Sequence, residues 1–118
     1  MKKKISRNEI QKIYSSKKKI KSEIFILFWK YSHDQTNDSV AIISVPKNKI
    51  KKAVDRNKLK RRIKESLYKE NELAYYIFNL KINFILIYTK NTVLNFKQIN
   101  KDLVNLLDKL RIKTNESV

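Results

Sequence analysis

The chain has 118 residues, 42% of them hydrophobic, and its 28 Lys and Arg residues outnumber 11 acidic residues to give a formal net charge of +17. This length and hydrophobic content favour one folded domain over residues 1–118. Cysteine is absent, which excludes disulfides and thiolate metal sites, and no apolar run reaches the roughly 18–20 residues that span a bilayer. We therefore expect a cytoplasmic protein without a membrane segment.

The positive charge is concentrated in two segments of the chain. Residues 1–21 carry nine basic side chains and one acidic side chain, and residues 44–64 carry ten and one. Clusters of this kind indicate a polyanionic partner and a binding affinity that falls with salt concentration.

The first elements predicted are a short helix and a basic connector. Apolar side chains recur at helical spacing over residues 6–15, and Ser6 and Glu9 have the spacing of a capping box. The lysine run 17–19 is interpreted as the connector that follows. Because the chain has no glycine, we expect Asn, Asp and Ser to occupy the left-handed positions of its turns.

Two strands are predicted next. Residues 22–31 and 40–45 are rich in β-branched and aromatic side chains, and a polar loop at 32–39 separates them. Alternation in the first strand separates two sets of side chains, one with Phe25, Leu27, Trp29 and Tyr31 and the other with Ile24, Ile26 and Phe28. One face must be core, and the other is either a stacking platform for unpaired bases or further packing surface.

The second basic segment predicts an amphipathic helix that begins near Asp55. Leu59, Ile63 and Leu67 share one arc of the helical wheel, so these residues can be buried while most of the cations face outward. Asp55, at the predicted cap of this helix, suits the helix dipole, and the amides of the first turn suit a phosphate. The helix therefore indicates contact with nucleic acid, although charge alone does not separate RNA from DNA, and the alternative is a solvated face that only maintains solubility.

A buried strand at residues 82–89 and a final helix from Asn95 to Ile112 complete the prediction, with Asn95 as the helix cap. Residues 114–118 are expected to form a disordered tail. The order is a helix, two or three strands, the basic helix, a strand and a helix, which indicates an α+β domain in which helices pack on one sheet.

The sequence predicts no catalytic residue and no metal ligand in the protein. The acidic residues are scattered, a chain without glycine cannot form a glycine-rich phosphate loop, and His33 lies in a polar loop without a recognisable partner.

The basic segment also resembles a known signature. Residues 53–65 resemble the Arg-Asn-Arg motif of the bacterial ribonuclease P protein subunit, with outright matches at Ala53, Val54, Arg56, Asn57, Lys60, Arg61 and Glu65. Lysines replace the family's arginines at positions 58 and 64, and Ser44, Val45, Lys47 and Lys49 resemble the motif's lead-in. The chain departs from the family pattern at Lys51 and Lys52, where the family often has glycine, and at Ile10, where phenylalanine is frequent.

The resemblance implies a two-layer α/β sandwich with the order αβββαβα, a mixed sheet and a left-handed βαβ crossover. It implies a subunit of an endoribonuclease that removes the 5′ leader of precursor tRNA, with the chemistry and most of the bound Mg²⁺ assigned to a catalytic RNA held by one protein copy. On this resemblance, the residues that bind RNA are Lys47, Lys49, Lys52, Arg56, Asn57, Lys58, Lys60, Arg61 and Lys64. The cleft for the leader would be formed by Ile10, Tyr14 and Phe28.

Two other functions are compatible with the basic helix. One is a structural RNA-binding protein, such as a ribosomal protein, and the other is a DNA-binding helix motif. Both predict nucleic-acid binding without any effect on precursor tRNA cleavage.

Overall fold

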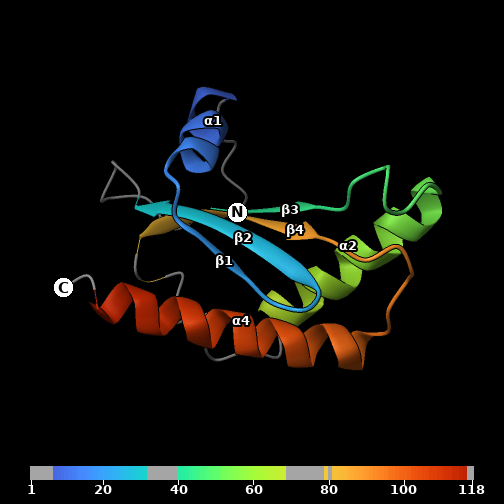
Figure 1. Cartoon of the computed structure of the whole chain (residues 1–118). Coiled ribbons are helices and arrows are strands. Elements are labelled where there is room, and N and C mark those ends of the chain that lie inside the picture. Colours follow the sequence, from blue (N-terminus) through green and yellow to red (C-terminus); the bar gives the residue numbers. More distant parts are fainter. Residues whose placement is uncertain (1–6, 32–39, 69–78, 80, 117–118) are drawn as a thin grey trace.

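The computed structural model describes residues 7–31, 40–68, 79 and 81–116, and the elements within these ranges follow the predicted order αβββαβα (Figure 1). The elements are α1 (Arg7–Ser15), β1 (Lys19–Lys21), β2 (Phe25–Tyr31), β3 (Ala41–Ser44), α2 (Ala53–Tyr68), β4 (Ile82–Tyr88) and α4 (Phe96–Glu116). The predicted cap Ser6, the loop at 32–39 and His33 lie outside the described residues. Within the described part of the chain, no helix is both long enough and apolar enough to cross a membrane.

The four strands form one mixed sheet in the order β1-β2-β4-β3. β2 pairs antiparallel with both β1 and β4, whereas β3 pairs parallel with β4. The connection from β3 through α2 to β4 is therefore a crossover between adjacent parallel strands. In Figure 1 both strands point the same way, β3 lies farther from the viewer, and α2 returns beneath the sheet. This arrangement is the left-handed crossover that the resemblance implies, against the right-handed general rule.

Alternation along the strands separates a core face from an open face. On the core face, β2 and β4 bury Phe25, Leu27, Trp29, Phe84, Leu86 and Tyr88 against α2 and α4. These two helices form the second layer of the sandwich (Figure 1). Helix α1 stands over one end of the opposite face, where Ile13 and Ile85 are buried. The predicted burial of Leu59, Ile63 and Leu67 is confirmed.

The structure corrects the interpretation of residues 17–19 as a connector. Lys19–Lys21 form the edge strand β1, in which Ile20 lies opposite Leu27 and joins the core. The pairing is set by a tight turn, in which the Phe25 amide donates to Ser22 Oγ (3.1 Å) and the Ser22 amide donates to the Phe25 carbonyl (2.9 Å). A lysine-rich triplet has little strand propensity of its own, so the free edge of β2 decides its conformation.

Two helix ends also differ from prediction. The Arg56 amide donates to the carbonyl of Lys52 (3.0 Å), so α2 begins at Ala53 and Asp55 lies inside its first turn instead of at the cap. α4 continues to Glu116, beyond the predicted end at Ile112, and takes in part of the expected tail. The buried Thr114, whose hydroxyl donates to the carbonyl of Arg111 (2.9 Å), extends the helical packing.

Lysines occupy the left-handed backbone positions among the described residues, contrary to the expectation of Asn, Asp and Ser. Lys17 has φ 63° and Lys81 has φ 58°. Lys17 follows the end of α1, the position where helices commonly end in a left-handed residue. Just before it, Ser16 Oγ lies 2.7 Å from the carbonyl of Ile13 and 3.0 Å from that of Trp29, which fixes the exit of the helix.

The loop between β4 and α4 is held by a buried phenol. The Tyr88 hydroxyl donates to the carbonyl of Thr92 (2.7 Å) and accepts from the amide of Leu94 (3.2 Å). At the helix start, Asn95 and Gln98 exchange side chain-to-amide hydrogen bonds of 2.9 and 3.2 Å, so the predicted Asn95 cap is confirmed as part of a reciprocal box. Burial raises the pKa of Tyr88 above its ordinary value of 10.0, and the Leu94 hydrogen bond and the Arg62 charge partly offset this rise.

Replacing Tyr88 with phenylalanine should lower the free energy of unfolding by about 1–3 kcal/mol at neutral pH, because buried backbone groups are left without their partner. The raised pKa of Tyr88 favours the neutral phenol in the folded state. The stabilisation that the Tyr88 hydroxyl provides is therefore complete below pH 10 and is lost as pH rises through the folded-state pKa. Urea unfolding of both proteins at pH 8 and at pH 11 should give a smaller difference at pH 11. A difference that does not change with pH would contradict this account.

Candidate nucleic-acid interface

The basic segment begins with a short turn that follows β3. Val45 and Ile50 are buried, and the Pro46 carbonyl accepts hydrogen bonds from the amides of Lys49 and Ile50 (both 3.1 Å). The turn is therefore anchored at both ends and presents Lys47 to solvent, while Lys49 is half-buried. We call residues 46–52 the lead-in turn.

Arg56 connects the lead-in turn to α2. Its guanidinium Nη1 donates to the carbonyls of Ile50 (3.0 Å) and Lys51 (2.7 Å). The resemblance implies an RNA-binding role for Arg56, and in the structure its side chain binds the chain's own backbone. One guanidinium group can donate to neighbouring acceptors together, so this contact joins the lead-in turn to the first turn of α2.

Two further contacts fix α2 against the last helix and its preceding loop. Arg62 Nη1 donates to the carbonyl of Leu94 (2.6 Å), and the hydroxyl of buried Ser66 donates to Asn100 Oδ1 (2.6 Å). Together with the buried arc of Leu59, Ile63 and Leu67, these contacts set the rotation of α2 about its axis. The remaining cations of α2 consequently lie on its outer side.

The residues of the signature differ in exposure. Lys47, Lys52, Asn57 and Arg61 are exposed, whereas Lys49, Arg56, Lys58, Lys60 and Lys64 are half-buried. Ala53 and Val54 are also exposed, and Val54 keeps 73% of its surface accessible. The first turns of α2 therefore expose the amide of Asn57, the cation of Arg61 and the apolar side chains of Ala53 and Val54.

A second candidate surface lies on the open face of the sheet. The rings of Tyr14 on α1 and Phe28 on β2 meet edge to face with centroids 5.1 Å apart, and Tyr14 is 39% exposed. Ile10 is half-buried one helical turn before Tyr14. The structure therefore brings together Tyr14 and Phe28, the aromatic residues of the predicted cleft, and places Ile10 on the same side of α1.

Sequence reasoning missed one residue of this surface. Lys19 places its Nζ 5.8 Å from the centroid of the Phe28 ring, on the side of the sheet that faces α1. The signal was the alternation of Lys19, Ile20 and Lys21, which is the pattern of a half-buried strand, but three residues were too few to separate it from a basic connector.

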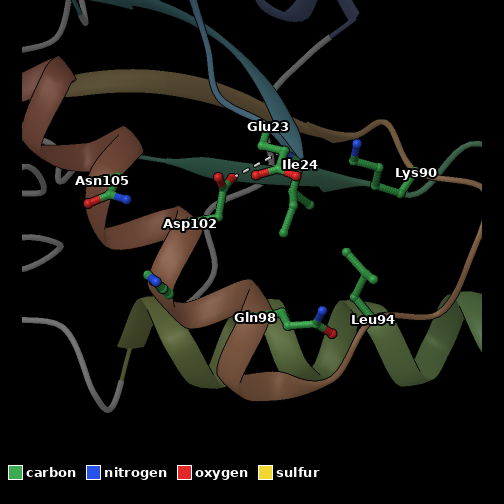
Figure 2. A pocket seen from close by; sticks show the side chains of 8 residues that line it. Glu23, Ile24, Lys90, Leu94, Gln98, Asp102 and Asn105 are labelled. Atoms are coloured by element: carbon green, nitrogen blue, oxygen red, sulfur yellow. Dashed lines mark hydrogen bonds between the residues drawn. The ribbon is translucent and has the colours of Figure 1, made fainter.

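A cavity of about 410 Å³ lies on the other side of the molecule, between the β1–β2 turn, the β4–α4 loop and α4 (Figure 2). Of the two carboxylates that line it, Glu23 and Asp102, the Asp102 side chain accepts hydrogen bonds from the Ser22 hydroxyl (2.5 Å) and the Ile24 amide (3.2 Å). These bonds fasten the hairpin to α4, so Asp102 has a structural role.

The described carboxylates do not fit a Mg²⁺ site. Asp102 is bonded to the hairpin, Asp108 pairs with Arg111 at 2.7 Å, and no three His, Cys, Asp or Glu side chains gather within the described ranges. Protein-bound Mg²⁺ needs carboxylate oxygens placed around one point, and these residues do not supply them.

One small α+β domain thus carries a basic amphipathic helix, the lead-in turn, and a sheet face with the partly exposed aromatic pair Tyr14 and Phe28. A family model described as Ribonuclease P matches residues 2–111. The chain belongs to the ribonuclease P protein family. Ribonuclease P is an Mg²⁺-dependent endoribonuclease ribonucleoprotein of tRNA processing, and this family supplies its protein subunit.

Solved structures of ribonuclease P proteins share the fold. The protein from Staphylococcus aureus is 23% identical with a TM-score of 0.72, and the match covers 91% of this chain and 93% of that one. The protein from Thermotoga maritima is 21% identical with a TM-score of 0.72, covering 92% of this chain and 96% of that one. No match was found among curated protein sequences.

Because Arg56 binds the lead-in turn, replacing it with alanine should destabilise the fold as well as remove a charge. We expect the free energy of unfolding to fall by about 1–2 kcal/mol, since two backbone carbonyls would then have no charged donor. Replacing the exposed Arg61 with alanine is the matched control and should change it by less than about 0.5 kcal/mol. Chemical denaturation of the two variants checks this; equal effects would contradict a structural role for Arg56.

Proposed function

We propose that this chain binds the catalytic RNA of ribonuclease P through α2 and the lead-in turn, and the 5′ leader of precursor tRNA through the open face of the sheet. The observation that carries the proposal is the orientation of α2, which buries Leu59, Ile63 and Leu67 completely, exposes Arg61, and leaves the lysines at 58, 60 and 64 partly accessible. The proposed RNA contacts are Lys47, Lys49, Lys52, Asn57, Lys58, Lys60, Arg61 and Lys64, with Arg56 acting mainly by holding the lead-in turn in place.

The leader is proposed to lie against Ile10, Tyr14 and Phe28. An exposed aromatic edge beside cations favours an unpaired strand, because bases stack on rings and phosphates bind cations largely without regard to sequence. A subunit that meets many different leaders needs this tolerance.

The reaction itself is assigned to the RNA partner. In the proposed complex one protein copy binds one RNA, the RNA holds the catalytic Mg²⁺, and the protein adds positive charge where two RNA molecules must approach each other. Neutralising phosphates reduces their mutual repulsion, so less Mg²⁺ is needed to bring substrate and catalytic RNA together.

Reconstitution tests the proposed partnership. The protein alone should leave precursor tRNA uncleaved, and the protein with its matching RNA should cleave it at a lower Mg²⁺ concentration than the RNA does alone. The measurement is the initial cleavage rate across a Mg²⁺ titration. An unchanged Mg²⁺ requirement, together with tight binding to another structured RNA, would favour the ribosomal alternative.

A double substitution tests the outer face of α2. Lys60→Ala with Arg61→Ala should weaken binding to the catalytic RNA and reduce the slope of log K against log salt by about two units, one for each phosphate that the variant no longer neutralises. The control is Lys97→Ala with Lys101→Ala, which removes the same charge from exposed positions of α4. Equal weakening in the two double variants would mean that net charge, and not the α2 surface, sets the affinity.

A further inference from the structure

On the open face of the sheet, a first row of directly opposed residues crosses all four strands. The strand registers place Lys21 opposite Ile26, Ile26 opposite Ile87, and Ile87 opposite Ser44. Ile26, Ile87 and Ser44 are half-buried, and Lys21 is exposed. Ile26 and Ile87 form the apolar middle of this row, which we call the apolar floor. The row ends in Ser44 at the β3 edge and in the cation of Lys21 at the β1 edge.

A parallel row runs beside it and contains the aromatic pair. In this second row Lys19 lies opposite Phe28, Phe28 opposite Ile85, and Ile85 opposite Ile42. The Tyr14 ring of α1 contacts the Phe28 ring edge to face, and Lys19 Nζ lies 5.8 Å from the centroid of the Phe28 ring. Both rows thus end at the same edge strand in an exposed lysine, so Lys19 and Lys21 form a basic rim along the open face.

The rim lysines are distinct from their neighbours in the run. Lys18 places its Nζ over the rings of Trp29 (4.8 Å) and Tyr31 (5.0 Å), which belong to the core face of the sheet. The backbone carbonyl of Lys21 accepts from Lys109 Nζ (3.4 Å), a contact that does not involve the Lys21 ammonium group. Alternation along β1 therefore directs two cations toward the open face and fastens the strand through its backbone.

The two edges of the sheet differ in what they adjoin. β3 leads directly into the lead-in turn and α2, whereas β1 lies three strands away (Figure 1). A strand that leaves the catalytic RNA at α2 would meet the floor at β3 and reach β1 last. Among the described elements, only α1 lies on this face, at one end of it, so the row from Ser44 to Lys21 forms a path beside α1.

We propose that the β1 rim, Lys19 and Lys21, binds phosphates of the distal part of the 5′ leader after the leader has crossed the sheet. This inference rests on the proposed function, and it adds a position along the leader. Three inter-strand steps of about 4.8 Å make a path of roughly 14 Å. At about 3.4 Å of rise per stacked nucleotide, a leader needs roughly four nucleotides or more to reach the rim.

The test compares leader lengths. Holoenzyme reconstituted with the Lys19→Gln, Lys21→Gln protein is measured for binding to precursor tRNAs with leaders of two and of ten nucleotides. We expect roughly 25-fold weaker binding of the ten-nucleotide substrate near 0.1 M salt, because two single-strand phosphate contacts together contribute about 1.4 to the salt exponent. The two-nucleotide substrate should bind as it does to the unaltered holoenzyme. Glutamine keeps a polar, solvated edge, and thermal unfolding confirms that the variant is folded.

Lys97→Gln with Lys101→Gln is the matched control, and it should retain the full advantage of the long leader because these lysines lie on α4 in the opposite layer. If the rim variant keeps that advantage, the rim has no role and the proposed function stands. If the rim variant self-associates while its affinity for the long leader is unchanged, the lysines only protect an open sheet edge, which also overturns the inference. If the unaltered holoenzyme itself does not distinguish leader lengths, leader binding by this face is wrong.

Discussion

β2 and β4 pair along seven residues, and this antiparallel ladder determines which side of the domain every neighbouring element occupies. Because successive side chains point to opposite faces, the ladder sends Leu27, Trp29, Phe84 and Leu86 toward the helices and Ile26, Phe28 and Ile87 toward the open face. A register shift of one residue would exchange these sets and would expose the core. The register between β2 and β4 therefore sets both the apolar floor of the open face and the core on the opposite face.

In this strongly basic chain, some cations make structural contacts and others remain exposed. On α2, Arg56 and Arg62 bind backbone carbonyls of neighbouring segments and so hold the helix in place. Asn57 and Arg61 remain exposed on its outer side. A concentrated basic surface repels itself, and a polyanion relieves that repulsion, which is consistent with membership of a family whose function is in a ribonucleoprotein.

The absence of glycine is accommodated by local contacts at Lys17, one of the two left-handed positions that the structure describes. At Lys17 a Cβ atom is tolerated where glycine is usual, and the preceding Ser16 provides a hydroxyl close to two carbonyls. β1 begins two residues after Lys17, at Lys19. The same turn thus ends α1 and leads into the edge strand that carries the rim lysines.

The sequence by itself determined every element except the short strand β1, together with the buried arc of α2, the Asn95 cap and the basic signature, because each depends on spacing along a single element. It also indicated that Tyr14 and Phe28 belong to one cleft, but only through the family resemblance. Tertiary structure alone decided that Lys19–Lys21 is a strand, that Arg56 binds the lead-in turn, and that Lys19 approaches Phe28. Each of these depends on a partner five or more residues away that lies in another element or turn, and helical or strand periodicity carries no information about such contacts.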